Sequence, residues 1–270
     1  MPARPRGSQR RRSGLVGPVW TVVVAAGSGR RFGGPKQFAS VAGRLVVEWS
    51  VAAARAATDG VVVVVPPGNQ AVGPSTFGAD AVVEGGPTRS ASVRLGLAAV
   101  PAIADVVIVH DAARPLAVPA LFQAVIAAVS GTGISGSADG ADGAVCAVPV
   151  VDTIKRVVDS GGVITVGTTL ERSDLVAVQT PQAFRADVLR RAHSDRTAVA
   201  EPTDDATLVE ALGGSVRVVP GDPANIKVTT RADLFFVEHM LAGESTRGPG
   251  GCGSGVPGGR GPGGSGSAGR

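Results

Sequence analysis

A glycine-rich segment with basic side chains is the part of the chain whose residue types point most directly to chemistry. The segment AAGSGRRFGGPKQF runs from Ala25 to Phe38 and directly follows a short apolar run. Small residues in such a turn let backbone N–H groups converge on the oxygens of an anion, and Arg31 and Lys36 add positive charge. A glycine turn with solvated basic side chains is the structural alternative that this segment alone leaves open.

The spacing of this segment excludes two common nucleotide-binding loops. The dinucleotide fingerprint is G-x-G-x-x-G, and after Gly27 and Gly29 the next glycine, Gly33, lies one residue too far along the chain. The fingerprint also requires an acid at the end of the next apolar run, and this run ends without one. A P-loop requires a G-K-[ST] triplet, and Lys36 is not part of one. The nature of the anion therefore stays open at this point.

Other polar clusters also follow apolar runs. In HDAARP, Asp111 occupies a position where a carboxylate can hold a hydroxyl group or a divalent ion, and an ion pair with Arg114 is an equally good interpretation. The segment EGGPTRSAS, residues 84–92, is a second glycine turn that opens a helix, and its hydroxyl groups by themselves favour helix capping. Three later segments are unremarkable when each is taken alone: VQTPQAF, PTDDATLVE and NIKVTT.

Alternating apolar and amphipathic segments predict the elements that position these clusters. The apolar runs span Trp20–Ala26, Gly60–Val65, Asp80–Gly85, Ala104–His110 and Gly143–Val150. Their unbroken β-branched character is typical of parallel strands buried on both faces. Helices are expected over 44–57, 88–100 and 119–130, with Thr88 or Ser90 as a cap and Pro119 in a first turn. The pattern predicts an α/β fold with a doubly wound, mostly parallel sheet and the clusters at its carboxyl edge.

The alternation stops at a segment that predicts a projecting β-arm. Residues 152–178 contain two alternating runs joined by DSGG, which is typical of a β-hairpin. An arm that leaves a parallel sheet needs a surface to pack on, and a second copy of the chain is the simplest partner. We therefore expect a homodimer. The preceding segment GTGISGSADGADG, residues 131–143, is expected to be a loop insertion.

Composition limits the folded part to the middle of this 270-residue chain. The first twelve residues contain five arginines and no acid, and the last 28 contain 13 glycines. We expect residues 1–17 to be a disordered basic tail, residues 18–242 to form one domain, and residues 243–270 to be a disordered Gly-rich tail. A solvated tail is favoured over a nucleic-acid-binding arm, so no nucleic-acid partner is expected.

The location that we expect is the cytoplasm. The first residues lack the apolar segment of a secretion signal, and the longest aliphatic runs are too short to cross a membrane. Two cysteines cannot build a disulfide framework, which fits a reducing compartment.

Seven motifs, taken in their order along the chain, resemble those of the 2-C-methyl-D-erythritol 4-phosphate cytidylyltransferases of the non-mevalonate isoprenoid pathway. They cover about Val19 to Leu241 and read AAGSGRRFGGPKQF, GGPTRSASV, HDAARP, DTIKR, ERSDLVAVQTPQAF, TDDA and NIKVTT. The resemblance implies a Rossmann-like nucleotidyltransferase sheet and transfer of CMP from CTP to methylerythritol phosphate, with release of pyrophosphate. It also implies Mg²⁺ or another divalent cation, held mainly by the nucleotide phosphates, and a homodimer whose arms complete each other's sites.

The resemblance also implies roles for individual residues. The catalytic positions, whose charge stabilises the reacting phosphates, match Arg31, Lys36 and Lys227. The nucleotide-binding positions match Ala25, Ala26, Gly27, Ser28 and Gly29 around the phosphates, and Gly85, Gly86, Arg89 and Ser92 around base and ribose, with Arg89 supporting that turn. The substrate-binding positions match Asp111, Ala112, Arg114, Thr153, Arg172 and Thr180. Asp111 also matches a position near the metal, and Arg172 one that reaches the partner's site.

Two alternatives stay open from the sequence. A ribitol-5-phosphate or other alditol-phosphate cytidylyltransferase would share the nucleotide half and differ around Thr153, Arg172 and Thr180. A non-catalytic nucleotide-binding protein of the same fold is disfavoured because both Arg31 and Lys36 are retained. A fused cyclodiphosphate synthase is not expected, because the Gly-rich tail cannot supply the ordered residues it needs.

Overall fold

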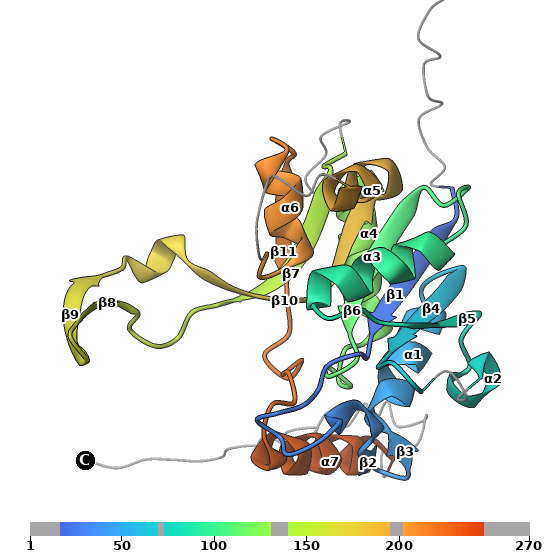
Figure 1. Cartoon of the computed structure of the whole chain (residues 1–270), viewed down its shortest axis with the longest axis horizontal. Coiled ribbons are helices and arrows are strands. Elements are labelled where there is room, and N and C mark those ends of the chain that lie inside the picture. Colours follow the sequence, from blue (N-terminus) through green and yellow to red (C-terminus); the bar gives the residue numbers. More distant parts are fainter. Residues whose placement is uncertain (1–16, 70–72, 131–139, 195–201, 246–270) are drawn as a thin grey trace, which may run out of the picture.

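A computed structural model describes residues 17–69, 73–130, 140–194 and 202–245 of the chain (Figure 1). The expected tails lie outside these residues, except for Gly17 at the start and residues 243–245 at the end, and so does most of the expected loop insertion at 131–143. Among the described residues, no helix is both long and apolar enough to cross a membrane.

Strands and helices alternate through the first half of the chain, as predicted. The strands are β1 Val19–Val24, β2 Ser40–Val41, β3 Arg44–Leu45, β4 Gly60–Val65, β5 Ala81–Glu84, β6 Val106–Asp111, β7 Gly143–Pro149, β8 Lys155–Ser160, β9 Val163–Thr169, β10 Val176–Arg185 and β11 Val216–Pro220. The helices are α1 Val46–Arg55, α2 Pro74–Phe77, α3 Arg89–Ala99, α4 Pro119–Ser130, α5 Ala186–Ser194, α6 Asp205–Ala211 and α7 Arg231–Ser245. Single 3₁₀ turns cover Lys36–Phe38 and Arg172–Asp174.

The predicted helix signals are confirmed. The Thr88 hydroxyl accepts a hydrogen bond from the backbone N–H of Ala91 at 3.1 Å and caps α3. Helix α4 begins at Pro119, where the missing N–H costs nothing because the first turn has no intrahelical acceptor. Helix α7 continues to Ser245, past the expected domain boundary at residue 242.

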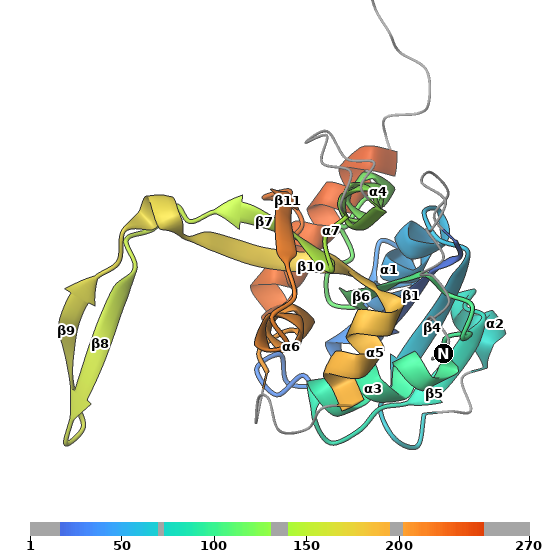
Figure 2. The same cartoon turned by 90° about the horizontal axis from the view of Figure 1, so that it is seen from above.

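A mostly parallel seven-stranded sheet forms the centre of the molecule, in the order β11-β7-β10-β6-β1-β4-β5. Strand β10 runs antiparallel between β6 and β7, and the other pairings within the sheet are parallel. Helices α1, α2 and α4 pack on one face of the sheet, and α3, α5 and α6 pack on the other (Figures 1 and 2). The predicted doubly wound α/β fold is thereby confirmed.

Helix α7 lies apart from the two helical layers and supports the glycine-rich segment. Its Val237 and Leu241 form a third apolar cluster with Val41 and Val46, against which Phe32 of the glycine-rich segment packs. The C-terminal helix therefore helps to hold the segment that follows β1.

The predicted hairpin projects from the body as an arm (Figures 1 and 2). Strands β8 and β9 pair antiparallel and are exposed along their whole length. Gly161 and Gly162 form the turn with φ angles of 67° and 89°, which only glycine adopts without strain. The body of this chain thus leaves the arm uncovered.

Candidate active site

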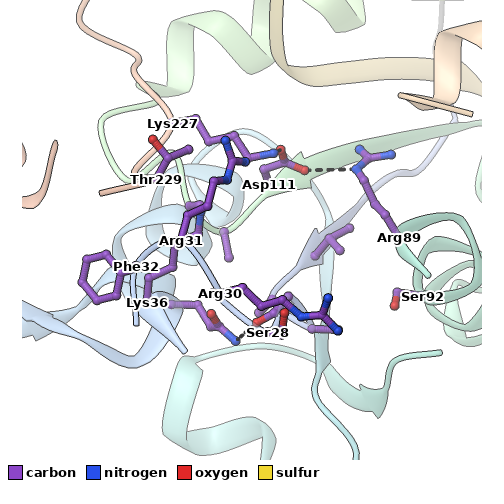
Figure 3. Close-up of a pocket in the computed structure, with 18 of the residues that line it drawn as sticks. Ser28, Arg30, Arg31, Phe32, Lys36, Arg89, Ser92, Asp111, Lys227 and Thr229 are labelled. Carbon is purple, nitrogen blue, oxygen red and sulfur yellow. Dashed lines mark hydrogen bonds and ion pairs between the residues drawn. The ribbon is translucent and has the colours of Figure 1, made fainter. Parts of the chain in front are cut away.

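A pocket of about 600 Å³ opens at the carboxyl edge of the sheet (Figure 3). It is lined by the segment after β1, the turn before α3, the end of β6, and Lys227 and Thr229 before α7. Polar clusters far apart in the sequence therefore meet here, because parallel strands place their carboxyl ends along one edge.

The glycine-rich segment is held in one conformation by its own backbone. Gly29 has a φ of 64°, and a Cβ there would lie 1.7 Å from the carbonyl oxygen of Gly34, so no other residue fits. The Gly29 carbonyl accepts hydrogen bonds from the backbone N–H groups of residues 32–34. The buried Gln37 side chain donates from Nε2 to the Gly27 carbonyl at 3.0 Å. Gln37 is a positioning residue for which the sequence carries no signal beyond its place in the motif.

The segment presents unused backbone donors to the pocket. Within the part of the chain that the structure describes, the N–H groups of residues 26–31 donate to no protein acceptor, and all six residues line the pocket. Successive free N–H groups in a glycine-rich turn form a concave site for anions such as phosphate. This geometry favours the anion-binding interpretation over a merely structural turn.

Among the described residues, five cationic side chains line this pocket: Arg30, Arg31, Lys36, Arg89 and Lys227. Of these, Arg30 extends away from Arg31 (Figure 3). The Lys36 ammonium donates to the carbonyl of Val228. Burial lowers the pKa of Lys36, the positive charge of Lys227 lowers it further, and Asp111 partly offsets both. A bound anion would relieve this crowding of like charges.

Asp111 is the carboxylate on which these charges converge. It lies at the end of β6, where Oδ2 accepts from Lys227 Nζ at 2.6 Å and Oδ1 from Arg89 Nε at 3.4 Å. Its backbone N–H donates to the Thr180 hydroxyl at 3.0 Å, because antiparallel β10 runs beside β6. Burial favours a raised pKa, but Arg89, Lys227 and Arg114 hold the pKa of Asp111 well below its usual range. Asp111 is therefore ionised and accepts hydrogen bonds rather than acting as a base.

Arg89 bridges two carboxylates, and its expected support of the glycine turn stays a prediction. Its Nη1 lies 2.8 Å from Asp205 Oδ2, in addition to the contact of Nε with Asp111. Asp205 in turn lies 3.0 Å from His193 Nε2 through its Oδ1. The motif TDDA contains Asp205, but a buried partner for it cannot be inferred from the motif alone.

The second glycine turn, which is expected to bind base and ribose, is held by hydrogen bonds of its own. The N–H of Gly85 donates to the Val65 carbonyl at 2.7 Å, and the N–H of Gly86 donates to the Ser92 hydroxyl at 3.1 Å. A Cβ on Gly85 would lie 2.5 Å from that of Ala26, so this glycine permits the close approach of two loops. Gly86 and Ser92 line the pocket, whereas Gly85 does not.

A second pocket of about 240 Å³ adjoins the first and shares Arg89, Asp111 and Lys227 with it. Its further lining residues come mainly from β10 and the start of α6, and they are Arg114, Val178, Gln179, Thr180, Gln182, Thr203 and Asp204. Arg114 also donates from Nη1 to the Asn225 carbonyl at 2.7 Å. Two adjoining compartments that share charged side chains suit two substrates that react with each other.

The structure brings most of the predicted site residues to these two pockets. The predicted residues that line the larger pocket are Ala25, Ala26, Gly27, Ser28, Gly29, Arg31, Lys36, Gly86, Arg89, Ser92, Asp111, Ala112 and Lys227. Arg114 and Thr180 line the smaller pocket. Thr153 and Arg172 lie on the exposed arm and line neither pocket, and Arg172 donates from Nη1 to the Val151 carbonyl at 2.7 Å. The chain by itself therefore does not bring these two residues to the site.

The donor set suits a metal ion only if a ligand supplies most of the coordination. Among the described residues, no group of three or more His, Cys, Asp or Glu side chains converges. Asp111 is the acidic side chain that lines the larger pocket, and both its oxygens face cations. Mg²⁺ commonly combines one or two carboxylates with substrate phosphates, and a bound polyphosphate would satisfy that requirement here.

Comparison with known proteins points to one family. The family model described as 2-C-methyl-D-erythritol 4-phosphate cytidylyltransferase matches residues 19–243. A protein of that name from Parasynechococcus marenigrum is 43% identical over 236 residues, which cover 82% of this chain and 96% of that protein. The protein of the same name from Streptomyces avermitilis is 43% identical over 236 residues, covering 82% of this chain and 90% of that one.

Solved structures and longer relatives extend this comparison. The crystal structure of the cytidylyltransferase of that name from Thermus thermophilus superimposes with a TM-score of 0.67 at 35% identity, covering 82% of this chain and 98% of that one. A protein named bifunctional enzyme IspD/IspF from Clavibacter michiganensis subsp. michiganensis is 44% identical over 239 residues. That match covers 84% of this chain but 55% of the relative, so the chain spans about half the length of such bifunctional relatives.

Proposed function

The chain belongs to the 2-C-methyl-D-erythritol 4-phosphate cytidylyltransferase family, and we propose that it transfers CMP from CTP to 2-C-methyl-D-erythritol 4-phosphate. The products would be 4-diphosphocytidyl-2-C-methyl-D-erythritol and pyrophosphate. The observation that carries this proposal is the pair of adjoining pockets with a shared wall of Arg89, Asp111 and Lys227. The larger pocket suits a nucleoside triphosphate, and the smaller suits a sugar-alcohol phosphate.

In the larger pocket, the free N–H groups of residues 26–31 bind the phosphates of CTP. A phosphate oxygen of the acceptor attacks the α-phosphorus, the new P–O bond forms, and the bond to the β-phosphate breaks to release pyrophosphate. The acceptor phosphate is already an anion at neutral pH, so no general base is needed. Arg31, Lys36 and Lys227 are placed to reduce the repulsion between the two anions and to stabilise the charge of the transition state.

In the smaller pocket, the chain offers both hydrogen-bond acceptors and positive charge to the second substrate. The ionised Asp111 accepts from a hydroxyl group of the erythritol chain, and Arg114 and Thr180 line the same pocket. Thr153 and Arg172 are absent from this wall. We assign them to the site of the partner subunit, where the partner's Arg172 binds the acceptor phosphate.

The arm supports a homodimer as part of the proposal. Val157, Val163, Ile164 and Val166 on the hairpin are each more than half exposed. An isolated two-stranded hairpin is marginally stable in water, so a covering surface is required. The second copy of this chain supplies that surface, and exchange of the arms completes both sites.

We further propose Mg²⁺ or another divalent cation as the cofactor, held mainly by the phosphates of CTP with Asp111 as the neighbouring carboxylate. When bound, it neutralises phosphate charge. Equilibrium dialysis of the ion against the protein with and without CTP tests this assignment without turnover. Binding that does not depend on CTP would contradict it. The free buried thiol of Cys146 agrees with the proposed cytoplasmic location.

Measurement of pyrophosphate release tests which reaction the protein catalyses. Purified protein is incubated with CTP, Mg²⁺ and either methylerythritol phosphate or ribitol 5-phosphate, with the Arg31→Gln variant as the control for contaminating activity. Release with methylerythritol phosphate alone is expected. Release with ribitol 5-phosphate alone would reassign the chain to the alditol-phosphate enzymes. No release with either would favour a non-catalytic nucleotide-binding protein.

A further inference from the structure

Two buried polar side chains behind the pockets connect to the charged wall between them. Asp205 begins α6 and His193 lies in the last turn of α5, and both are at least 95% buried. Neither lines either of the two pockets described above, yet Asp205 contacts Arg89 at 2.8 Å and His193 at 3.0 Å. The chain of contacts runs from His193 through Asp205 and Arg89 to Asp111.

The geometry indicates which groups carry charge. His193 Nδ1 is buried and has no hydrogen-bond partner in the described part of the chain, so a proton on it would be unsatisfied. Because the ionised carboxylate of Asp205 can only accept, Nε2 carries a proton and His193 donates from it to Asp205 at 3.0 Å. Burial favours a raised pKa for Asp205, but the hydrogen bond from His193 and the charge of Arg89 outweigh it and lower the pKa. Asp205 is thus an ionised carboxylate whose counter-charge is Arg89.

The distances show that Asp205 holds Arg89 more closely than Asp111 does. The Arg89 guanidinium lies 2.8 Å from Asp205 and 3.4 Å from Asp111. Asp111 makes its short contact, 2.6 Å, with Lys227 instead. Without Asp205, the unbalanced Arg89 would pair fully with Asp111 and compete with any hydroxyl group that Asp111 accepts from.

We propose that Asp205 and His193 are positioning residues that hold Arg89 in the wall between the two pockets and thereby keep Asp111 available to the acceptor substrate. The identity of that acceptor as methylerythritol phosphate rests on the proposed function. Asp111 and Arg89 line both pockets, but Asp111 is the group that accepts from the acceptor's hydroxyl, so the effect is expected mainly on binding of the acceptor. The N–H groups of residues 26–31, which receive CTP, lie outside this chain of contacts.

Steady-state kinetics on full-length variants test this proposal, with KM determined separately for each substrate. Asp205→Asn is expected to raise KM for methylerythritol phosphate about 10–100-fold and KM for CTP much less, as expected for a displaced orienting group. His193→Gln keeps an amide donor near the position of Nε2 and is expected to stay close to wild type. His193→Phe removes that donor in a similar volume and is expected to shift KM in the same direction as Asp205→Asn.

A double variant identifies Arg89 as the residue through which Asp205 acts. Arg89→Gln combined with Asp205→Asn is expected to be no worse than Arg89→Gln alone, because the shared interaction is already lost. The matched control is Asp142→Asn, which removes a carboxylate that accepts from the Ser215 N–H at 2.9 Å; Asp142 precedes β7 and lines neither of the two pockets. It is expected to lower thermal stability without changing either KM.

The results that would contradict the positioning role differ from those that would contradict the proposed reaction. If Asp205→Asn and His193→Phe lower only the melting temperature and leave both KM values like those of Asp142→Asn, the positioning role is wrong. A crystal structure of Asp205→Asn gives the same answer without turnover, since Arg89 is expected to move toward Asp111. An unmoved Arg89 overturns the proposal. A wild-type protein that releases no pyrophosphate overturns the proposed function instead.

Discussion

The pocket at the carboxyl edge of the sheet and the arm formed by β8 and β9 differ in what holds them in place. In the pocket, Asp111 is 8% exposed and is bonded to Arg89, Lys227 and Thr180. The arm is exposed throughout, and its two strands pair only with each other. Contacts within this chain assemble the cationic part of the site, whereas Thr153 and Arg172 on the arm line neither pocket. The difference indicates that the proposed second subunit would act through the arm.

The largest expected effect lies on the pocket side of this comparison. Arg31→Gln and Lys36→Gln should each lower kcat/KM about 10²–10³-fold, by analogy with loss of one transition-state donor. Arg30→Gln is the comparison within the same loop, because Arg30 also lines the pocket but extends away from Arg31 (Figure 3). Pyrophosphate release measures all three variants. Equal losses for Arg30 and Arg31 would mean that the loop acts only through its total charge.

The next prediction tests whether the arm belongs to the other subunit's site. Arg172→Ala and Lys36→Ala should each be nearly inactive alone, and their mixture should recover about a quarter of wild-type activity under random subunit exchange. Half of the dimers are then mixed, and one of the two sites in each mixed dimer has both intact residues. If exchange is demonstrated without recovery, Arg172 acts in its own subunit or not at all.

A smaller effect, on assembly of the subunits, is expected for a change on the apolar face of the arm. Ile164→Lys should shift sedimentation toward the monomer and lower activity, because the exposed Ile164 would place a charge where the proposed second copy covers the hairpin. Ile103→Lys is the matched control at a similarly exposed isoleucine outside the arm, and surface changes of this kind typically alter stability by less than about 0.5 kcal/mol. Identical sedimentation of both variants and wild type would contradict a role for the arm in dimerisation.

The smallest expected effect concerns acid stability of the pocket. The folded-state pKa values of Asp111 and Asp205 lie below the ordinary carboxyl value, so the unfolded chain binds more protons in acid. Their stabilisation is fully present above the ordinary value near 3.8 and is lost as the pH falls through the lowered folded pKa. Urea unfolding of wild type, Asp111→Asn and Asp205→Asn at several pH values below 5 measures this contribution. The variants should depend less steeply on pH, and parallel curves would contradict the assignment.

Much of the fold is predictable from local patterns. Strand β4 and helix α4 have the predicted bounds, since an unbroken β-branched run and a proline-initiated apolar helix are strong local signals. Strand β10 is not predictable in this way, because Pro181 within VQTPQAF argues against a central strand. The sheet accommodates the proline where the pairing with β7 shifts register between Val178 and Gln182. Only the neighbouring strands decide that this segment lies in the sheet.

In the candidate site, too, the local motifs are predictable from the sequence, whereas the contacts between distant residues are not. The chain contains 26 lysines and arginines and 22 acidic residues, so the sequence alone does not select which of them pair. Arg89 and Asp205 are separated by 116 positions, and their contact exists because α3 and α6 cover the same face of the sheet. The buried Gln37 and the internal hydrogen bonds of the Gly85–Gly86 turn depend on tertiary packing in the same way.

Local sequence specifies the chemical groups of this protein and the turns that present them. Glycines mark where the backbone must turn tightly, and β-branched runs mark the strands whose ends carry polar residues. Folding selects which charges meet, makes Arg89 join two carboxylates, and places Thr153 and Arg172 on the exposed arm. The difference is one of range, since backbone preferences act between neighbours in sequence, whereas ion pairs and burial depend on residues that only folding brings together.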